Sequence, residues 1–142
     1  MSGYAYRHVV GFEETNLVGN VYYANHIRWQ GRAREMFVRE FAPELLQELQ
    51  QDLRIVTTRV GCDYFSELFA FDEVVIKMYA AAISQSRVSM HFDYFRSTAG
   101  GEELIAQGEQ QVAFMRLQDA RLSPIPVPEV LVKALRNYLY PG

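Results

Sequence analysis

The sequence has a single cysteine, Cys62, and only three histidines, His8, His26 and His91, among its 142 residues. One cysteine cannot form an intrachain disulfide and cannot build a cysteine-rich metal site. The histidines show no ligand spacing such as HExxH. We therefore expect no bound metal and no other cofactor.

Basic runs and long apolar runs are also missing. The formal net charge of -3 argues against nucleic acid or an anionic membrane surface as the main partner. No apolar run approaches the length of a membrane span, and the opening residues MSGYAYRHVV lack a signal-peptide core. These absences predict a cytoplasmic protein. The length suits one domain over residues 1–142 with an ordinary core.

Aromatic residues are abundant, with nine tyrosines and nine phenylalanines. Such a content suits a cavity for a flat, unsaturated or long apolar group, although most aromatic side chains fill ordinary cores. The densest pattern lies between Phe12 and Phe41, where a turn passes through Gly19 and leads into a helix predicted over 24–41. That stretch has no proline and is too long for a strand.

The predicted helix has several faces when it is wound at 3.6 residues per turn. One narrow charged face contains Arg28, Arg32, Glu35 and Arg39. Most of the remainder is apolar, which predicts a largely buried helix: Ala24, Ile27, Trp29, Ala33, Met36, Phe37, Val38 and Phe41. Inside the apolar sector runs a second polar row of Tyr23, His26, Gln30 and Arg34.

Arg34 needs an explanation at this inner position, because a buried guanidinium cannot relieve its charge by losing a proton. The commoner reasons are that the side chain reaches out to solvent or pairs with a carboxylate from a neighbouring strand. His26 by itself is more often a hydrogen-bonded core residue. A binding role is the alternative for both side chains.

The turn before the helix favours that alternative. Gly19 has no side chain, so another backbone or a ligand can come close there. The first N–H groups of the helix are unsatisfied donors at the positive end of its dipole. A carbonyl oxygen that gathers negative charge would be stabilised at this point, which Asn16 could also face.

The period changes after the helix. A short helix is predicted at 44–50, and alternating patterns predict strands at 4–10, 54–65, 72–84, 87–96 and 103–117. The strands at 72–84 and 87–96 should form a hairpin, the loop at 98–101 a turn, and Pro128 the start of a closing helix through Tyr140. One apolar helix wrapped by a curved antiparallel sheet is an α+β fold.

These residues carry a resemblance to a known family. The whole chain resembles the hot dog fold, and residues 14–35 resemble the signature of the 4-hydroxybenzoyl-CoA thioesterase-like acyl thioesterases. The segment ETNLVGNVYYANHIRWQGRAREMF is most similar to the thioesterases associated with enediyne polyketide synthases. The matching residues are Asn16, Gly19, Val21-Tyr22, Asn25, His26 and Ala33-Arg34.

Two departures from the broader family concern catalysis. Asn16 stands where most members have a catalytic aspartate, and Gly31 stands near the position where another branch has a glutamate. An amide is neither a useful base nor a nucleophile, and glycine has no side chain. General-base and nucleophilic catalysis through these two positions are therefore not open to this chain. The enediyne-associated group is similar in lacking the acid. His26 replaces a common tyrosine, and its imidazole could act as a base.

The resemblance implies hydrolysis of a polyene β-ketoacyl or β-hydroxyacyl thioester on the phosphopantetheine of a synthase's acyl carrier domain. A β-keto acid product would then lose carbon dioxide without a cofactor. Catalysis would be electrostatic, through the backbone N–H near Tyr23, the amide of Asn16 and the guanidinium of Arg34. An open strand edge and the relatives' pairing imply a homodimer with sites at the subunit junction. The resemblance also implies that two such dimers form a homotetramer.

Three other functions stay open. The first is an ordinary acyl-CoA thioesterase, and the second is a hydratase or dehydratase with an Asp/His pair. The second needs an acid for His26, whereas Glu13 and Glu14 lie on the wrong side of Asn16. The third is a non-catalytic protein that shields an acyl chain.

Overall fold

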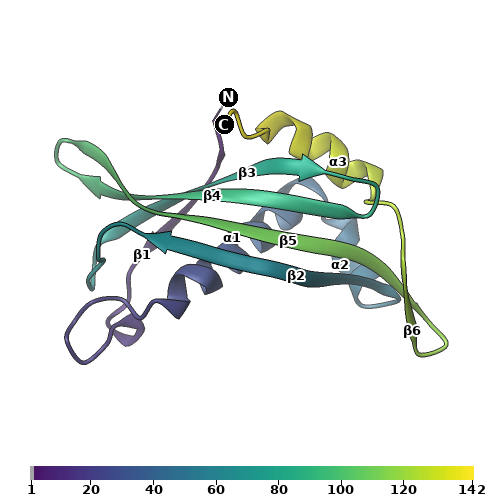
Figure 1. Ribbon diagram of the computed structural model, residues 1–142, viewed down its shortest axis with the longest axis horizontal. Helices are drawn as coiled ribbons and strands as arrows, with labels where there is room; N and C mark the ends of the chain where they lie inside the picture. Colours follow the sequence, from purple (N-terminus) through teal and green to yellow (C-terminus); the bar gives the residue numbers. More distant parts are fainter. Residues whose placement is uncertain (1) are drawn as a thin grey trace.

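The structure, a computed structural model, describes residues 2–142. Figure 1 shows a long helix behind a twisted sheet, with shorter helices beside it. The elements in chain order are β1 (Tyr4–Val9), η1 (Phe12–Glu14), α1 (Ala24–Phe41), α2 (Glu44–Leu49), β2 (Leu53–Tyr64), β3 (Glu73–Ile83), β4 (Arg87–Thr98), β5 (Gly101–Gln118), β6 (Arg121–Pro124), α3 (Glu129–Leu135) and η2 (Arg136–Tyr138).

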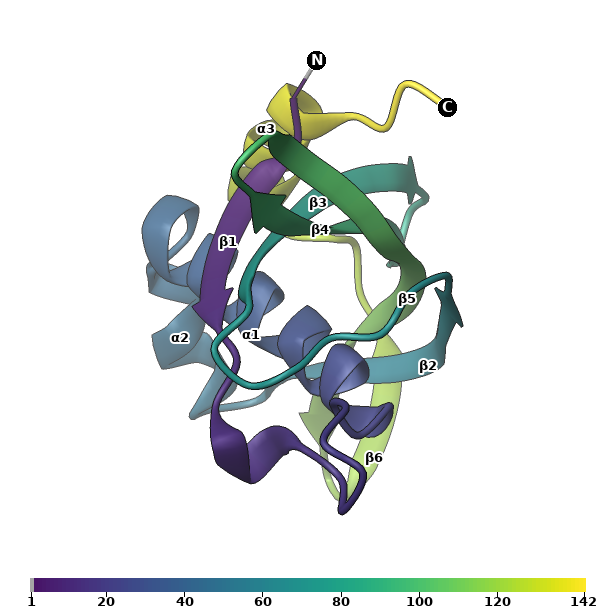
Figure 2. The same cartoon turned by 90° about the vertical axis from the view of Figure 1, so that its left-hand side faces the viewer.

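The strands form one antiparallel sheet in the order β1-β3-β4-β5-β2, and β6 pairs with the end of β5. β3 and β4 make the predicted hairpin. β2 and β3 follow one another in the chain, but β2 pairs with β5 and lies at the far edge. Viewed end-on, the sheet curls around α1 (Figure 2). This arrangement confirms the predicted α+β hot dog fold.

The core lies between α1 and the concave face of the sheet. Trp29, Ala33 and Phe37 on α1 are buried against alternate strand residues such as Ile76 and Phe92. The four residues of the predicted charged face are exposed, as their spacing indicated: Arg28, Arg32, Glu35 and Arg39. No helix described in residues 2–142 is long and apolar enough to cross a membrane.

The structure corrects three details of the sequence prediction. Tyr23 was placed in the inner row, but its side chain is 62% exposed because it lies at the helix N-cap. The closing helix ends at Leu135 and continues only as the 3-10 turn η2. β6 was not predicted, since the turn that leads into it uses Asp119 and Ala120 with positive φ in place of glycine.

Candidate functional site

The carboxylate of Glu14 fixes the turn before α1. Its oxygens lie 2.7 Å from Nε2 of His8, 2.8 Å from the N–H of Gly11 and 2.8 Å from the indole N–H of Trp29. Burial alone would raise the pKa of this carboxyl group, but these hydrogen bonds outweigh it and hold the pKa below its ordinary value. Glu14 is therefore an ionised structural anchor.

The backbone of Glu14 extends the same anchor to the helix. Its carbonyl oxygen accepts a hydrogen bond of 2.9 Å from the side-chain amide of Asn25 and another of 2.9 Å from the N–H of Tyr22. The sequence pattern did not indicate this role, since Glu14 drew attention only as an acid for His26. The available signal was a carboxylate beside a helix start that carries Trp29 one turn further on.

Asn16 opens a tight turn that projects from this anchor. Its N–H donates to the carbonyl of Asn20 at 2.7 Å, its carbonyl accepts from Gly19 at 2.9 Å, and its side-chain amide donates to Oδ1 of Asn20 at 3.1 Å. Gly19 has a φ of 96°, which favours glycine. Leu17 and Val18 form the tip and are exposed. The amide of Asn16 is thus held at the surface by a turn that requires glycine.

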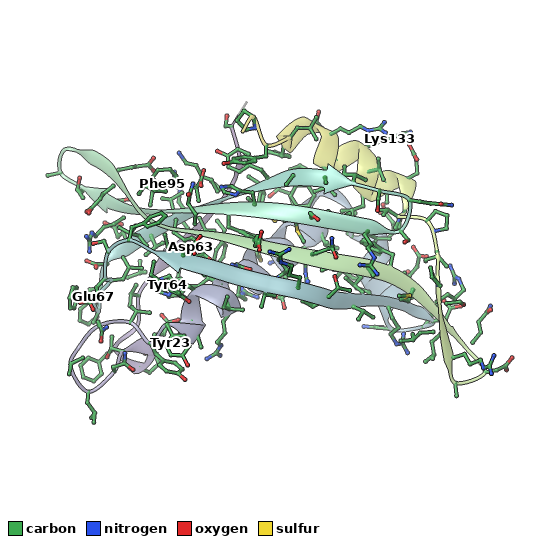
Figure 3. The ribbon with its side chains drawn as sticks, in the orientation of Figure 1. Tyr23, Asp63, Tyr64, Glu67, Phe95 and Lys133 are labelled. Carbon is green, nitrogen blue, oxygen red and sulfur yellow. The ribbon has the colours of Figure 1, made fainter. Side chains whose placement is uncertain are left out.

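The first turn of α1 presents a free backbone donor. The neighbouring N–H groups of Tyr22 and Asn25 are bonded to the carbonyls of Glu14 and Tyr22. The N–H of Tyr23 makes none of the hydrogen bonds found within residues 2–142. The carbonyl of Tyr23 is held from the other side by the hydroxyl of Tyr64 at 2.8 Å, and Figure 3 shows both residues at this end of the molecule.

His26 lies in an aromatic cage one turn below. Its ring centroid is 4.8 Å from that of Tyr64, 5.1 Å from Trp29 and 5.6 Å from Tyr94. Neither ring nitrogen makes a hydrogen bond to any group in the described chain, although the side chain is buried. Burial lowers the pKa of His26 to about 4, and the carbonyl of Tyr23, which lies nearby but outside hydrogen-bonding geometry, partly opposes this. The imidazole is neutral at pH 7.

Arg34 points toward the sheet and meets an amide. Its Nη1 donates to Oε1 of Gln110 at 2.7 Å. Gln110 is 5% exposed and donates to Gln30 at 3.5 Å, and Gln30 donates to the carbonyl of Gly61 at 3.1 Å. Within residues 2–142 no carboxylate pairs with Arg34, and burial lowers the pKa of its guanidinium. The interior position was predicted correctly, and the carboxylate partner, one of the two common explanations for a buried arginine, is absent from the described chain.

The side chain of Arg34 lines both an internal cavity and a surface groove. A small cavity of about 20 Å³ lies between α1, the sheet and α3, and its other lining side chains are apolar: Phe37, Val38, Ile55, Met78, Val88, Met90, Val112, Phe114, Leu131 and Leu135. A groove of about 510 Å³ runs over α1, α2 and the start of β2. It is lined by Arg32, Arg34, Glu35, Met36, Val38, Arg39, Leu46, Leu49 and Ile55. Arg34 is the cation that the two spaces share.

The predicted site residues fall into two groups. Asn16, Tyr23 and His26 belong to the turn and the first turn of α1, whereas Arg34 lies in its middle. From Tyr23 to Arg34 the helix rises about 16 Å. One chain therefore does not bring Asn16 and Arg34 together. Among residues 2–142 no group of three or more His, Cys, Asp or Glu side chains is placed to hold a metal ion.

Comparisons with known proteins agree on the family. The sequence model of the Thioesterase-like superfamily matches residues 10–135. Crystal structures of the dynemicin thioesterase, described in terms of polyene binding, include a chain 43% identical to this one, with 99% of each chain covered and a TM-score of 0.94. No curated protein matches the sequence.

More distant solved structures share the fold. 4-Hydroxybenzoyl-CoA thioesterase from Pseudomonas sp. strain CBS-3 is 18% identical, with 94% of this chain and 99% of that chain covered and a TM-score of 0.78. The 1,4-dihydroxy-2-naphthoyl-CoA thioesterase from Synechocystis is 20% identical, with 94% and 96% covered and a TM-score of 0.77. At these identities the likeness concerns the fold alone.

Proposed function

The chain belongs to the Thioesterase-like superfamily, which makes it a thioester hydrolase by family, and from this premise we propose that its substrate is a polyketide thioester. The acyl chain would be a polyene carried by the acyl carrier domain of an enediyne polyketide synthase. The observation that carries this proposal is the 43% identity with the dynemicin thioesterase over 99% of both chains.

The reaction transfers the acyl group from sulfur to water. Water adds to the thioester carbonyl, the C–S bond breaks, and the thiol of the carrier leaves with a proton while the free acid is released. If the acyl group is a β-ketoacyl chain, the acid then loses carbon dioxide and takes up a proton to become a methyl ketone. That second step needs no group from the protein.

The chemistry would depend on fixed dipoles and one fixed charge. The N–H of Tyr23 lies at the positive end of α1 and would polarise the thioester carbonyl. Asn16 would hold the attacking water or the acyl oxygen, since its amide cannot serve as a base. Arg34 would stabilise the developing oxyanion or the β-oxygen of the chain. In the first turn of α1, on the Tyr23 side of the site, the neutral ring of His26 would offer one donor and one acceptor.

A dimer would resolve the separation of Asn16 from Arg34. β2 is an edge strand of twelve residues, Leu53–Tyr64, and such an open edge tends to pair. The turn with Asn16 lies near the Tyr64 end of β2, where Tyr64 bonds to Tyr23, and Arg34 faces the groove at Ile55 near the other end. Antiparallel pairing of two β2 edges would bring Asn16 of one protomer toward Arg34 of its partner.

The cations of the sheet do not define a docking surface for the carrier domain. Four cations of the sheet could meet an acidic carrier surface, but each has a partner within the chain. Lys77 bonds to Glu102 at 3.1 Å, Arg59 to Glu109 at 2.7 Å and Arg96 to Glu103 at 2.9 Å, and Arg87 donates to Gln111 at 3.1 Å. We assign none of them to the carrier surface.

The test is hydrolysis of a polyene thioester on a carrier domain, with product analysis by mass spectrometry. We expect free acid or methyl ketone, and faster turnover than with simple CoA thioesters. Retained thioester would overturn the proposal, and equal turnover of CoA thioesters would favour a general acyl-CoA thioesterase. Mixing Asn16→Ala and Arg34→Ala protomers should restore activity, because each mixed dimer would contain one intact pair.

A further inference from the structure

Arg34 is a charged group whose hydrogen-bonding capacity the rest of the chain uses only in part. A guanidinium carries five N–H donors, and the structure accounts for one hydrogen bond, to Gln110 at 2.7 Å. The carboxylate of the adjacent Glu35 also lines the groove, but it pairs with Arg32 at 2.7 Å. The charge of Glu35 favours the charged form of Arg34, but no carboxylate within residues 2–142 forms an ion pair with it. A partly buried cation with spare donors and no ion-pair partner favours an anion from outside.

The surroundings of Arg34 restrict what kind of anion fits. On the groove side, the charged residues Arg32, Glu35 and Arg39 lie on the rim, and apolar side chains from both helices and from β2 form the rest of the lining: Met36, Val38, Leu46, Leu49 and Ile55. On the interior side, the lining of the small cavity is apolar apart from Arg34 itself. A matching ligand has one carboxylate head, which an arginine binds with two parallel hydrogen bonds, and an unbranched apolar tail.

We propose that the long-chain carboxylate released by hydrolysis binds in this groove through Arg34 and inhibits the enzyme until its charge is lost, a form of regulation that rests on the proposed function. Decarboxylation of a β-keto carboxylate breaks the bond to the carboxyl carbon and releases carbon dioxide, and the carbon that remains takes up a proton from water. The methyl ketone that remains is neutral and has no head group for Arg34. Loss of carbon dioxide thus clears the site.

The experiment compares two ligands of similar length that differ in charge, decanoate and 2-undecanone. Isothermal titration calorimetry at fixed ionic strength should give an affinity for decanoate at least about tenfold higher, because hydrogen bonds to charged groups are stronger than neutral ones. Decanoate should also inhibit hydrolysis of an acyl thioester competitively, and 2-undecanone should inhibit it only weakly.

Variants locate the head group. Arg34→Met should lower the affinity for decanoate about tenfold or more and leave that for 2-undecanone unchanged, whereas Arg34→Lys should retain part of the preference. Arg28→Met removes the same charge from an exposed position of α1 outside the groove, and it should leave both affinities unchanged. Circular dichroism checks that each variant is folded.

The possible failures are separate. Equal affinity for the acid and the ketone, or full decanoate affinity in folded Arg34→Met, would overturn the carboxylate site while hydrolysis by the wild-type protein stands. Tight decanoate binding by a protein that hydrolyses no thioester would retain the anion site and overturn the proposed function.

Discussion

Two partly buried charged groups, Glu14 before α1 and Arg34 within α1, differ in how many hydrogen bonds they make. The carboxylate of Glu14 receives hydrogen bonds from His8, Gly11 and Trp29, all at 2.7 to 2.8 Å. The guanidinium of Arg34 has one bond, to the neutral amide of Gln110. Hydrogen bonds lower the pKa of Glu14 in spite of its burial, whereas burial lowers that of Arg34 and so acts against its charge.

The difference separates a structural charge from an available one. A fully bonded ion stabilises its surroundings, and removing it leaves several donors without a partner. An ion with spare donors and no ion-pair partner carries a desolvation cost that a ligand can offset. Glu14 therefore anchors the start of α1, whereas Arg34 in the middle of α1 remains able to bind a ligand.

The largest effect on catalysis should come from replacing Arg34 or Asn16, which the proposed site brings together. Arg34→Ala and Asn16→Ala should each lower kcat about a hundredfold, since removing one preorganised donor typically costs about 3 kcal/mol in the barrier. Steady-state kinetics with an acyl-carrier thioester measures this. The melting temperature of Arg34→Ala should stay near that of the wild type. Near-normal turnover in both variants would show that Arg34 and Asn16 have no catalytic role.

Replacing Glu14 should instead affect mainly the stability of the fold. Glu14→Gln should lower the free energy of unfolding by about 2 kcal/mol, because an amide replaces an ion that three donors contact. Urea unfolding at pH 7 measures the loss, with the exposed Glu13→Gln as control. Equal stability of the two variants would contradict the anchor.

Acid should affect the same group. The folded-state pKa of Glu14 lies below its ordinary value of 4.5, so its stabilising contribution is present above pH 4.5 and is lost as the pH falls through the folded-state pKa. Between pH 4.5 and pH 3, the wild type should therefore lose more stability than Glu14→Gln. Unfolding curves measured at several pH values test this, and parallel losses in both proteins would refute it.

A smaller gain is expected at His26. His26→Phe should raise the free energy of unfolding by about 1 to 2 kcal/mol at pH 7, because it removes two buried nitrogens without hydrogen bonds. Thermal unfolding measures the gain. His91→Phe, which deletes the 2.7 Å contact with Asp93, should be destabilising instead. A lower melting temperature for His26→Phe would show that the imidazole is satisfied.

The same histidine predicts a pH window. Its folded-state pKa of about 4 lies below the ordinary 6.5, so between these values the unfolded chain binds a proton that the folded chain does not. The wild type should lose stability as the pH falls from 6.5 to 4, by at most about 3 kcal/mol. His26→Phe should lack this contribution, which unfolding curves at pH 7 and pH 4.5 would detect.

The smallest effect should come from a charge outside the helix. Arg59 pairs with Glu109 on the sheet, and its side chain is 70% exposed. Because exposed pairs contribute little, Arg59→Gln should change the free energy of unfolding by less than about 0.5 kcal/mol. The KM for a carrier-bound substrate should stay within about twofold. A large rise in KM would assign Arg59 to carrier docking.

Local patterns predicted much of the fold and part of the site. The bounds of α1 and its exposed charges follow from helical spacing, and the β3–β4 hairpin follows from alternation with a polar turn. The inward position of Arg34 was also predicted. A signal for its partner was present, since Gln110 falls in step with Val112 and Phe114 along β5, but alternation alone does not say which helical residue it meets.

By itself, the sequence determined which side chains share a face, because periods of 3.6 and 2 are set by neighbours in the chain. Only the tertiary structure decided which faces meet. It paired β2 with β5, gave Glu14 three donors, placed Arg34 against Gln110, and left His26 without a hydrogen bond in the described chain. Contacts of this kind depend on strand order and sheet curvature, which join residues far apart in the chain and leave no local period.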